Sequence, residues 1–175
     1  MVADFGGNAE TTRKEYGFNG KLPEGNMTSS VLLLNGPNLN LLGMRDPKTY
    51  GSTTLRKIEE RVTELGTELG VIVKCAQSNS EGAMVDLIHE ARNGLGVIIN
   101  PGAYGHYSYS IRDAIELLEV PVIEIHISNI HAREEFRHAS VISPVVSGFI
   151  CGCGVFGYEL ALRALVEQLG DKVRR

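Results

Sequence analysis

An arginine and a tyrosine, Arg45 and Tyr50, lie five residues apart in a loop that contains Pro47 and is bounded by Gly43 and Gly51. A free tyrosine side chain has a pKa of about 10 and is a poor base at neutral pH. A guanidinium beside it stays charged and favours the phenolate, which lowers that pKa. The loop is therefore a candidate lid that carries a base. A surface arginine and a tyrosine that merely packs would give the same spacing.

A second group of polar residues, Glu124, His126 and Ser128, alternates along the apolar segment VPVIEIHIS. Side chains two residues apart project to the same side of a strand. A carboxylate beside an imidazole can fix the tautomer of the ring or hold it protonated, as a general acid requires. A histidine satisfied within the core is the alternative. Three polar side chains on one side of a buried strand are costly unless they are hydrogen-bonded, which favours a site.

Two further segments carry candidate binding groups. Residues 101–106 (PGAYGH) contain glycines that permit close backbone approach to a ligand, and end at His106. This histidine falls near the start of a predicted helix, where backbone N–H groups favour oxygen-rich ligands; a helix-capping role is the alternative. The run 131–138 (HAREEFRH) predicts a mostly solvent-exposed charged helix, from which one arginine could reach the same site.

The elements that must position these groups alternate regularly from residue 31 onward. Apolar segments predict strands at 31–35, 71–75, 96–100, 120–127 and 148–152. Amphipathic spacing predicts helices at 54–69, from an N-cap at Ser80 to Gly94, around 111–118 and around 162–169. This alternation indicates an α/β fold, a flavodoxin-like three-layer sandwich whose five-stranded parallel sheet has the order 2-1-3-4-5. Ligands bind beyond the carboxyl ends of such strands, where the polar residues Asn35 and Asn100 follow the first and third strands.

Length and composition fit one compact domain, since the 175 residues are 43% hydrophobic. Residues 1–29 are polar and aperiodic, and we expect a disordered N-terminal extension or a remnant of expression, with Met27 as a candidate native start. A functional tail is the alternative. Residues 30–170 are expected to form the single catalytic domain, and 171–175 a charged tail.

Several classes of function are disfavoured. The net charge of −4 and the lack of basic clusters argue against a nucleic-acid partner, and no apolar run predicts a membrane span. Cys75, Cys151 and Cys153 form no disulfide or metal-binding pattern. The last two are expected to be buried free thiols, which favours a cytoplasmic location. No zinc-protease, dinucleotide, P-loop or serine-hydrolase motif is present, so neither a metal nor a cofactor is expected.

Several sequence blocks, taken in order, define a family resemblance that extends from residue 31 to about 169. They are NGPNLNLLG (35–43) with Arg45 and Tyr50-Gly51, QSN (77–79) with EG (81–82), NPGA (100–103), EIHISN (124–129) and REEFRH (133–138). These blocks resemble the type II 3-dehydroquinate dehydratases.

The resemblance implies a hydro-lyase without cofactor or metal, which dehydrates 3-dehydroquinate to 3-dehydroshikimate through an enolate. The shikimate pathway of aromatic amino acid biosynthesis and quinate catabolism both use this reaction. The resemblance also implies a homododecamer, a tetramer of trimers. Its implied catalytic residues are Tyr50 as base, Arg45 as the cation that lowers the pKa of Tyr50, Asn38 as the holder of an enolate-stabilising water, His126 as acid and Glu124 as its orienting partner. The implied substrate contacts are Asn100, His106, Ile127, Ser128, Arg137 and, from a neighbouring subunit, Asp113.

Three residues depart from the family pattern. Gly105 stands where many members carry threonine, Ala139 where a polar residue is frequent, and Asp46 where glutamate is common. None of them removes an implied catalytic group, so we expect altered affinity rather than altered chemistry. Two rival hypotheses remain. A non-catalytic flavodoxin-like module that binds a carboxylate would have no use for Arg45 and Tyr50, and a flavin electron carrier would need a hydroxyl-rich phosphate loop after the first strand.

Overall fold

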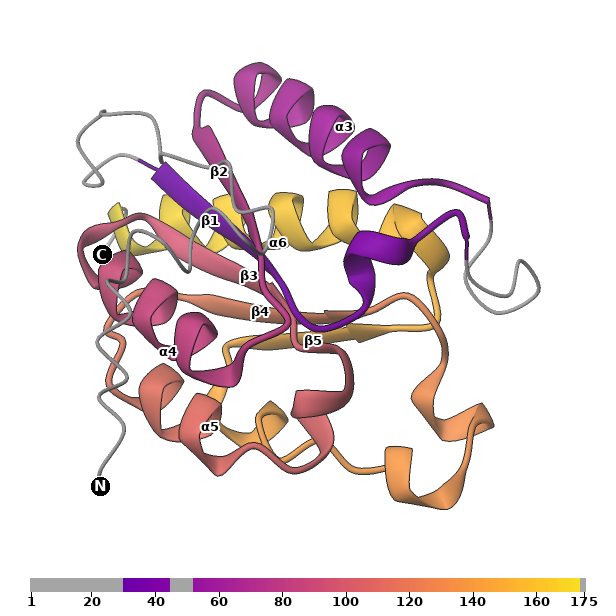
Figure 1. Ribbon diagram of the computed structural model, residues 1–175. Helices are drawn as coiled ribbons and strands as arrows, with labels where there is room; N and C mark the ends of the chain where they lie inside the picture. Colours follow the sequence, from indigo (N-terminus) through magenta and orange to yellow (C-terminus); the bar gives the residue numbers. More distant parts are fainter. Residues whose placement is uncertain (1–29, 45–51, 174–175) are drawn as a thin grey trace, which may run out of the picture.

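The computed structural model describes residues 30–44 and 52–173 of the chain. Five parallel strands form one sheet in the order β2-β1-β3-β4-β5 (Figure 1). The strands are β1 (Ser30–Asn35), β2 (Ile72–Gln77), β3 (Gly96–Asn100), β4 (Val122–His126) and β5 (Gly148–Cys151). The predicted fold class and strand order are therefore confirmed. The fourth strand is shorter than predicted, since it begins after Pro121, which has no N–H for the ladder.

Four α-helices cover the two faces of the sheet. They are α3 (Leu55–Glu68), α4 (Glu81–Glu90), α5 (Tyr109–Glu116) and α6 (Gly157–Val173). Helices α3 and α6 lie on one face, and α4 and α5 on the other (Figure 1). Side-chain hydroxyls cap three of these helices: Thr54 accepts from Lys57 N–H, Ser80 from Ala83 N–H and Ser108 from Ile111 N–H. The N-cap predicted at Ser80 is confirmed.

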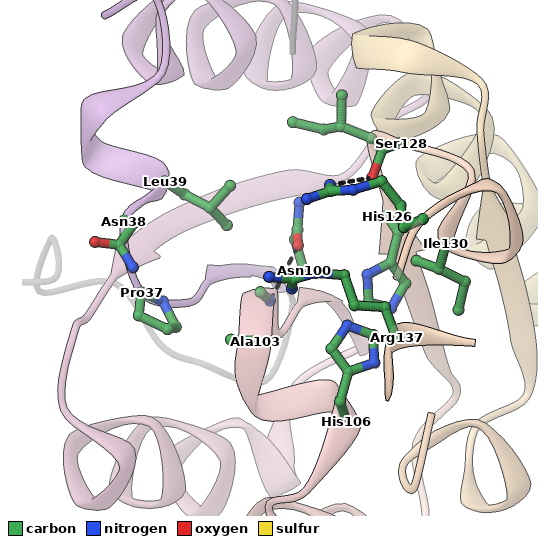
Figure 2. A pocket seen from close by; sticks show the side chains of 13 residues that line it. Pro37, Asn38, Leu39, Asn100, Ala103, His106, His126, Ser128, Ile130 and Arg137 are labelled. Atoms are coloured by element: carbon green, nitrogen blue, oxygen red, sulfur yellow. Dashed lines mark hydrogen bonds between the residues drawn. The ribbon is translucent and has the colours of Figure 1, made fainter. Parts of the chain in front are cut away.

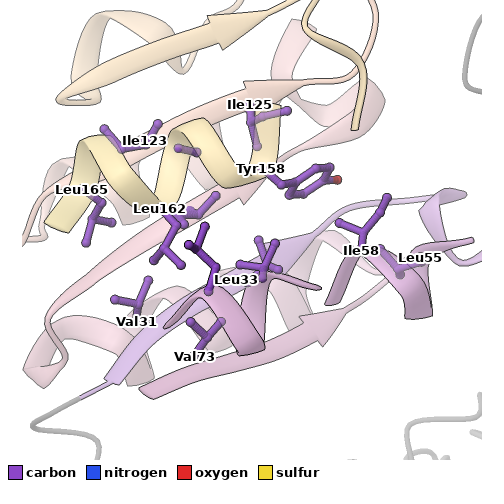
Figure 3. Close-up of a cluster of buried hydrophobic side chains, with 14 of the residues drawn as sticks. Val31, Leu33, Leu55, Ile58, Val73, Ile123, Ile125, Tyr158, Leu162 and Leu165 are labelled. Atoms are coloured by element: carbon purple, nitrogen blue, oxygen red, sulfur yellow. The ribbon is translucent and has the colours of Figure 1, made fainter. Parts of the chain in front are cut away.

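The alternation of side chains along each strand divides the core into two clusters. Val31 and Leu33 pack with residues of α3 and α6 (Figure 3), whereas Leu32 and Leu34 pack with residues of α4 and α5. The same two-residue period continues to the strand ends. Asn35 and Asn100 therefore belong to the α3–α6 side, and Glu124 and His126 to the α4–α5 side. A site at this edge draws its side chains from both faces of the sheet.

Two local predictions are wrong. The segment 131–138 is not a helix but two 3-10 turns, Ile130–Ala132 and Glu135–Arg137, separated by extended backbone at Arg133 and Glu134. The i,i+3 pair of Glu134 and Arg137, which seemed to support a helix, fits the three-residue period of the second turn. Cys153 is exposed and Cys151 only half-buried, because both lie at and beyond the end of the edge strand β5. In the part of the chain that the structure describes, no helix has the length and apolarity to cross a membrane.

Candidate active site

A cavity of about 120 Å³ lies at the carboxyl ends of β1, β3 and β4 (Figure 2). Its walls come from three segments, 37–39 after β1, 100–106 at and after β3, and 126–137 at and after β4. Gly36 allows the first two segments to meet, because its N–H donates to Asn100 O at 2.7 Å and an added Cβ would collide with the backbone of Pro101. The predicted site residues in its lining are Asn38, Asn100, His106, His126, Ile127, Ser128 and Arg137.

A buried carboxylate fixes the imidazole at the end of β4. His126 Nε2 lies 2.7 Å from Glu124 Oε1, and the two side chains are 6% and 0% exposed. The carboxylate accepts, so Nε2 donates, and Nδ1 is the ring nitrogen that can exchange a proton with a ligand. Ser140 donates to the same oxygen, Glu124 Oε1, at 2.7 Å. The dyad that the two-residue spacing predicted is thus formed, with a serine beneath it that the sequence analysis did not identify.

Gly105 lies directly against this dyad. A Cβ at this position would be 3.4 Å from both Glu124 Oε1 and His126 Cε1, and 2.8 Å from Pro101 Cγ. The clash would be with Pro101 in the same loop, whereas the two distances to the dyad are ordinary van der Waals contacts. Within the described part of the chain, Glu124 Oε2 is buried without a hydrogen-bond partner. The departure from the family pattern at Gly105 thus falls beside the proposed acid and not at the rim of the cavity.

His106 adds a second imidazole on the same side of the cavity. Its ring stacks at 5.8 Å, between centroids, on that of His126. Its Nδ1 lies 2.9 Å from Ala139 O, and since a carbonyl only accepts, Nδ1 carries the hydrogen. Burial is the largest effect and lowers the pKa of His106, and the charge of Arg137 lowers it further, against the opposing effect of the hydrogen bond to Ala139 O. The neutral ring therefore offers Nε2 as a hydrogen-bond acceptor. The residue does not cap α5, because Ser108 does.

Neutral amides hold the loop after β1. Asn38 has a φ of 65° and is the one non-glycine residue with positive φ among those described. Its backbone N–H donates to Asn79 Oδ1 at 2.9 Å, and Gln77 Nε2 donates to the same oxygen at 3.1 Å. Tyr104 donates to Asn79 O at 2.8 Å. Asparagine tolerates the left-handed conformation better than most residues, and Asn79 provides the partner that stabilises it here.

Two arginines of the segment after β4 bring positive charge to the cavity. Arg133 and Arg137 line it, and among the described lining residues no carboxylate is present. Arg133 Nη1 donates to Ser128 Oγ at 3.3 Å, which leaves the hydroxyl hydrogen of Ser128 for a ligand. Arg137 Nε donates to Glu134 Oε2 at 3.0 Å, and its guanidinium lies 4.6 Å above the ring of Phe136. Such a cavity suits a small anion that also carries hydroxyl groups.

Some predicted residues do not lie in this cavity. Arg45, Tyr50 and the departure Asp46 lie outside the described residues. Asp113 is an exposed residue of α5 and does not line the cavity of its own chain. Asn35, expected in the ligand crevice, is fully buried beneath it, where its Oδ1 accepts from the Tyr158 hydroxyl.

Four residues that support or line the site were missed from the sequence: Asn79, Arg133, Ser140 and Tyr158. Arg133 belongs to the charged run that had suggested one arginine. The other three act through hydrogen bonds to residues distant in the chain, for which no local pattern exists.

Comparison with known proteins identifies the family of this chain. The family described as Dehydroquinase class II matches residues 29–166. The chain is 57% identical over 142 residues to the 3-dehydroquinate dehydratase of Anoxybacillus flavithermus, which covers 81% of this chain and 96% of that protein. The type II dehydroquinase of Propionibacterium acnes superposes with a TM-score of 0.77 at 49% identity, over 82% of this chain and 99% of that one.

The type II dehydroquinase of Butyrivibrio crossotus gives the same TM-score, 0.77, at 46% identity over 78% of this chain and 97% of that one. These matches extend over most of the chain and nearly the full length of each relative. The chain belongs to the class II dehydroquinase family.

Proposed function

We propose that this chain dehydrates 3-dehydroquinate to 3-dehydroshikimate, as a hydro-lyase of the shikimate pathway. Family membership supports the assignment. The observation that carries it is the juxtaposition of a buried Glu124–His126 pair with a cavity lined by two arginines and no described carboxylate. The substrate is a hydroxylated ring with a carboxylate, which fits that lining. Quinate catabolism would use the same reaction.

The first step is removal of a proton from the carbon next to the ketone. We assign it to Tyr50 as a phenolate, with Arg45 lowering its pKa, on the family resemblance of the lid segment. The enolate needs a hydrogen-bond donor in the same site. Asn38 lines the cavity at the end of β1 and is assigned the water that supplies it.

The second step expels a hydroxyl group, which must be protonated as it leaves. His126 is the assigned acid, since Glu124 holds Nε2 and leaves Nδ1 to deliver the proton. Base and acid then come from different segments, the loop after β1 and the end of β4. A ring bound between them can be deprotonated at one atom and protonated at another.

The remaining lining residues bind the ring. Arg137 supplies charge for the carboxylate. The ring hydroxyls are assigned to Asn100, to the neutral Nε2 of His106, to the Ser128 hydroxyl and to the backbone N–H of Ile127. Asp113 is proposed to contact the substrate bound by a neighbouring subunit of a homododecamer. A cytoplasmic location, the domain bounds 30–170 and the tail at 171–175 stay predictions.

The test is to add the purified protein to 3-dehydroquinate with a chelator present, and to follow ultraviolet absorbance of the conjugated enone product. We expect steady enone formation. A folded sample that forms no enone contradicts the proposal. Binding of 3-dehydroquinate without turnover would then favour the carboxylate-binding module, and a yellow protein the flavin carrier.

A further inference from the structure

The hydroxyl of Tyr158 joins two side-chain amides at neighbouring strand ends. Asn100 Nδ2 donates to Tyr158 Oη at 2.7 Å, and Tyr158 donates to Asn35 Oδ1 at 2.8 Å. Asn35 and Asn100 are register partners of β1 and β3. Tyr158 itself comes from the first turn of α6 and is 0% exposed in the apolar cluster with Ile125 and Leu162 (Figure 3).

These contacts fix the orientation of the Asn100 amide. The Tyr158 hydroxyl has one hydrogen, which it gives to Asn35, so it can only accept from Asn100. On the other side, Asn100 Oδ1 accepts from Gly102 N–H at 3.2 Å. A flipped amide would face the hydroxyl oxygen with an oxygen and the Gly102 N–H with an NH₂ group. The Gly102 N–H would then lose its acceptor, and the Tyr158 hydroxyl would have to give up its bond to Asn35 in order to donate to Asn100.

The Tyr158 hydroxyl can serve as a permanent hydrogen-bond partner because it stays protonated near neutral pH. Burial raises the pKa of Tyr158 well above that of free tyrosine. The neutral hydroxyl therefore stays available as a partner of Asn100 near neutral pH. One hydrogen of its Nδ2 is used by Tyr158, and the second is available to an oxygen atom of the ligand.

We infer that Tyr158 is a positioning residue for ligand binding: it locks the Asn100 amide, through the Asn35–Tyr158–Asn100 chain, so that Nδ2 serves as a hydrogen-bond donor. The inference rests on the proposed function for its kinetic readout. Tyr158 does not line the cavity, and Asn35, at the other end of this chain of hydrogen bonds, is fully buried. The site thereby selects a hydroxyl or carboxylate oxygen at this point of the ring.

The test is Tyr158→Phe, which removes only the hydroxyl, assayed by enone formation from 3-dehydroquinate. A contact made equally in the ground state and the transition state acts on KM. We expect KM to rise roughly tenfold, the effect of about one hydrogen bond, with kcat within about twofold. A variant that is merely less stable would instead lose active protein, lowering kcat without changing KM. Val31→Ala is the matched control, on the same strand and face as Asn35 but roughly 13 Å away along β1.

A double-mutant cycle with Asn100→Ala completes the test. If Tyr158 acts through Asn100, Tyr158→Phe has little further effect on KM in the Asn100→Ala background. An undiminished effect in that background, or unchanged KM in the single variant, would overturn the inference. If Tyr158→Phe does not fold, Asn35→Ala is used in the same cycle, with a severalfold rise in KM expected. Failure of the wild-type protein to turn over 3-dehydroquinate would instead contradict the proposed function.

Discussion

The two groups of strand ends that form the cavity differ in charge. At the end of β4 the polar groups are ionic or ionisable: a fully buried carboxylate, an imidazole 2.7 Å from it and a serine hydroxyl on the same oxygen. At the ends of β1 and β3 they are neutral, two amides joined by a tyrosine hydroxyl. A proton can move at the first group, whereas the second only orients donors and acceptors. The comparison separates the proposed proton donor from the buried amides that only orient a ligand, and each group can be tested independently.

The largest loss of activity is expected at the end of β4, where the ionisable side chains lie. His126→Ala should lower the rate of elimination by about 10²–10⁴-fold, the usual contribution of general acid catalysis. Exchange of the proton next to the ketone with solvent, measured by nuclear magnetic resonance in D₂O, should be impaired less, because it does not require the acid. His89→Ala, an exposed histidine of α4, is the control. Equal losses in exchange and elimination would remove His126 from the acid role.

A second test of the groups at the end of β4 concerns Ser140, which donates a hydrogen bond to the carboxylate of the Glu124–His126 pair. Ser140→Ala removes the hydrogen bond to Glu124 Oε1 and should lower kcat roughly tenfold, the effect of about 1.5 kcal/mol, which is the lower end of what a hydrogen bond to a charged group contributes. Ser143→Ala is the matched control, because its hydroxyl bonds Ser140 O in the same turn and does not contact Glu124 in the described structure. Equal losses of kcat in the two variants would mean that the turn, and not the bond to Glu124, matters.

A smaller effect is expected where Asn79 supports the loop after β1. Asn79→Ala removes the acceptor of the Asn38 N–H and should lower kcat about fivefold, the effect of about 1 kcal/mol. Ser78→Ala is the control, since among the described residues its hydroxyl forms hydrogen bonds only with Ser80. Kinetics of Asn79→Ala that match those of the wild type would show that the left-handed conformation of Asn38 needs no such partner.

The smallest effect concerns pH and His106. Because burial lowers its pKa below 6.5, the unfolded chain takes up a proton at higher pH than the folded one does. The stability contribution of His106 is thus intact above about pH 6.5 and falls as the pH drops below that value. Denaturant midpoints at pH 7.5 and 5 should differ less in His106→Gln than in the wild type, by a small amount since the ring is only half-buried. His89→Gln is the control, and an equal pH dependence in wild type and His106→Gln would contradict the assignment.

Periodic patterns predicted the strands, the helices and the sheet order, because each pattern depends only on residues that are close together in the sequence. Apolar runs and helical spacing led to the order β2-β1-β3-β4-β5, and the two-residue spacing of Glu124 and His126 led to their contact. The fate of Asn35 could not be predicted in this way. A polar residue at a strand end looks the same in sequence whether it faces a ligand or a buried hydroxyl from a helix 123 residues later. The charged residues at 131–138 likewise fit either a helix or two 3-10 turns, and their spacing alone does not distinguish the two.

The most direct test of this division compares Glu124→Gln with Asn100→Ala, with kcat and KM measured for both on 3-dehydroquinate. The first removes the charge beside His126 and should lower kcat by about 10–100-fold with little change in KM. The second removes a neutral donor and should raise KM with a smaller change in kcat. That crossed pattern is the predicted result. If both variants change the same kinetic parameter, kcat or KM, the proposed difference in role between the ionic group at β4 and the neutral amides at β1 and β3 is contradicted.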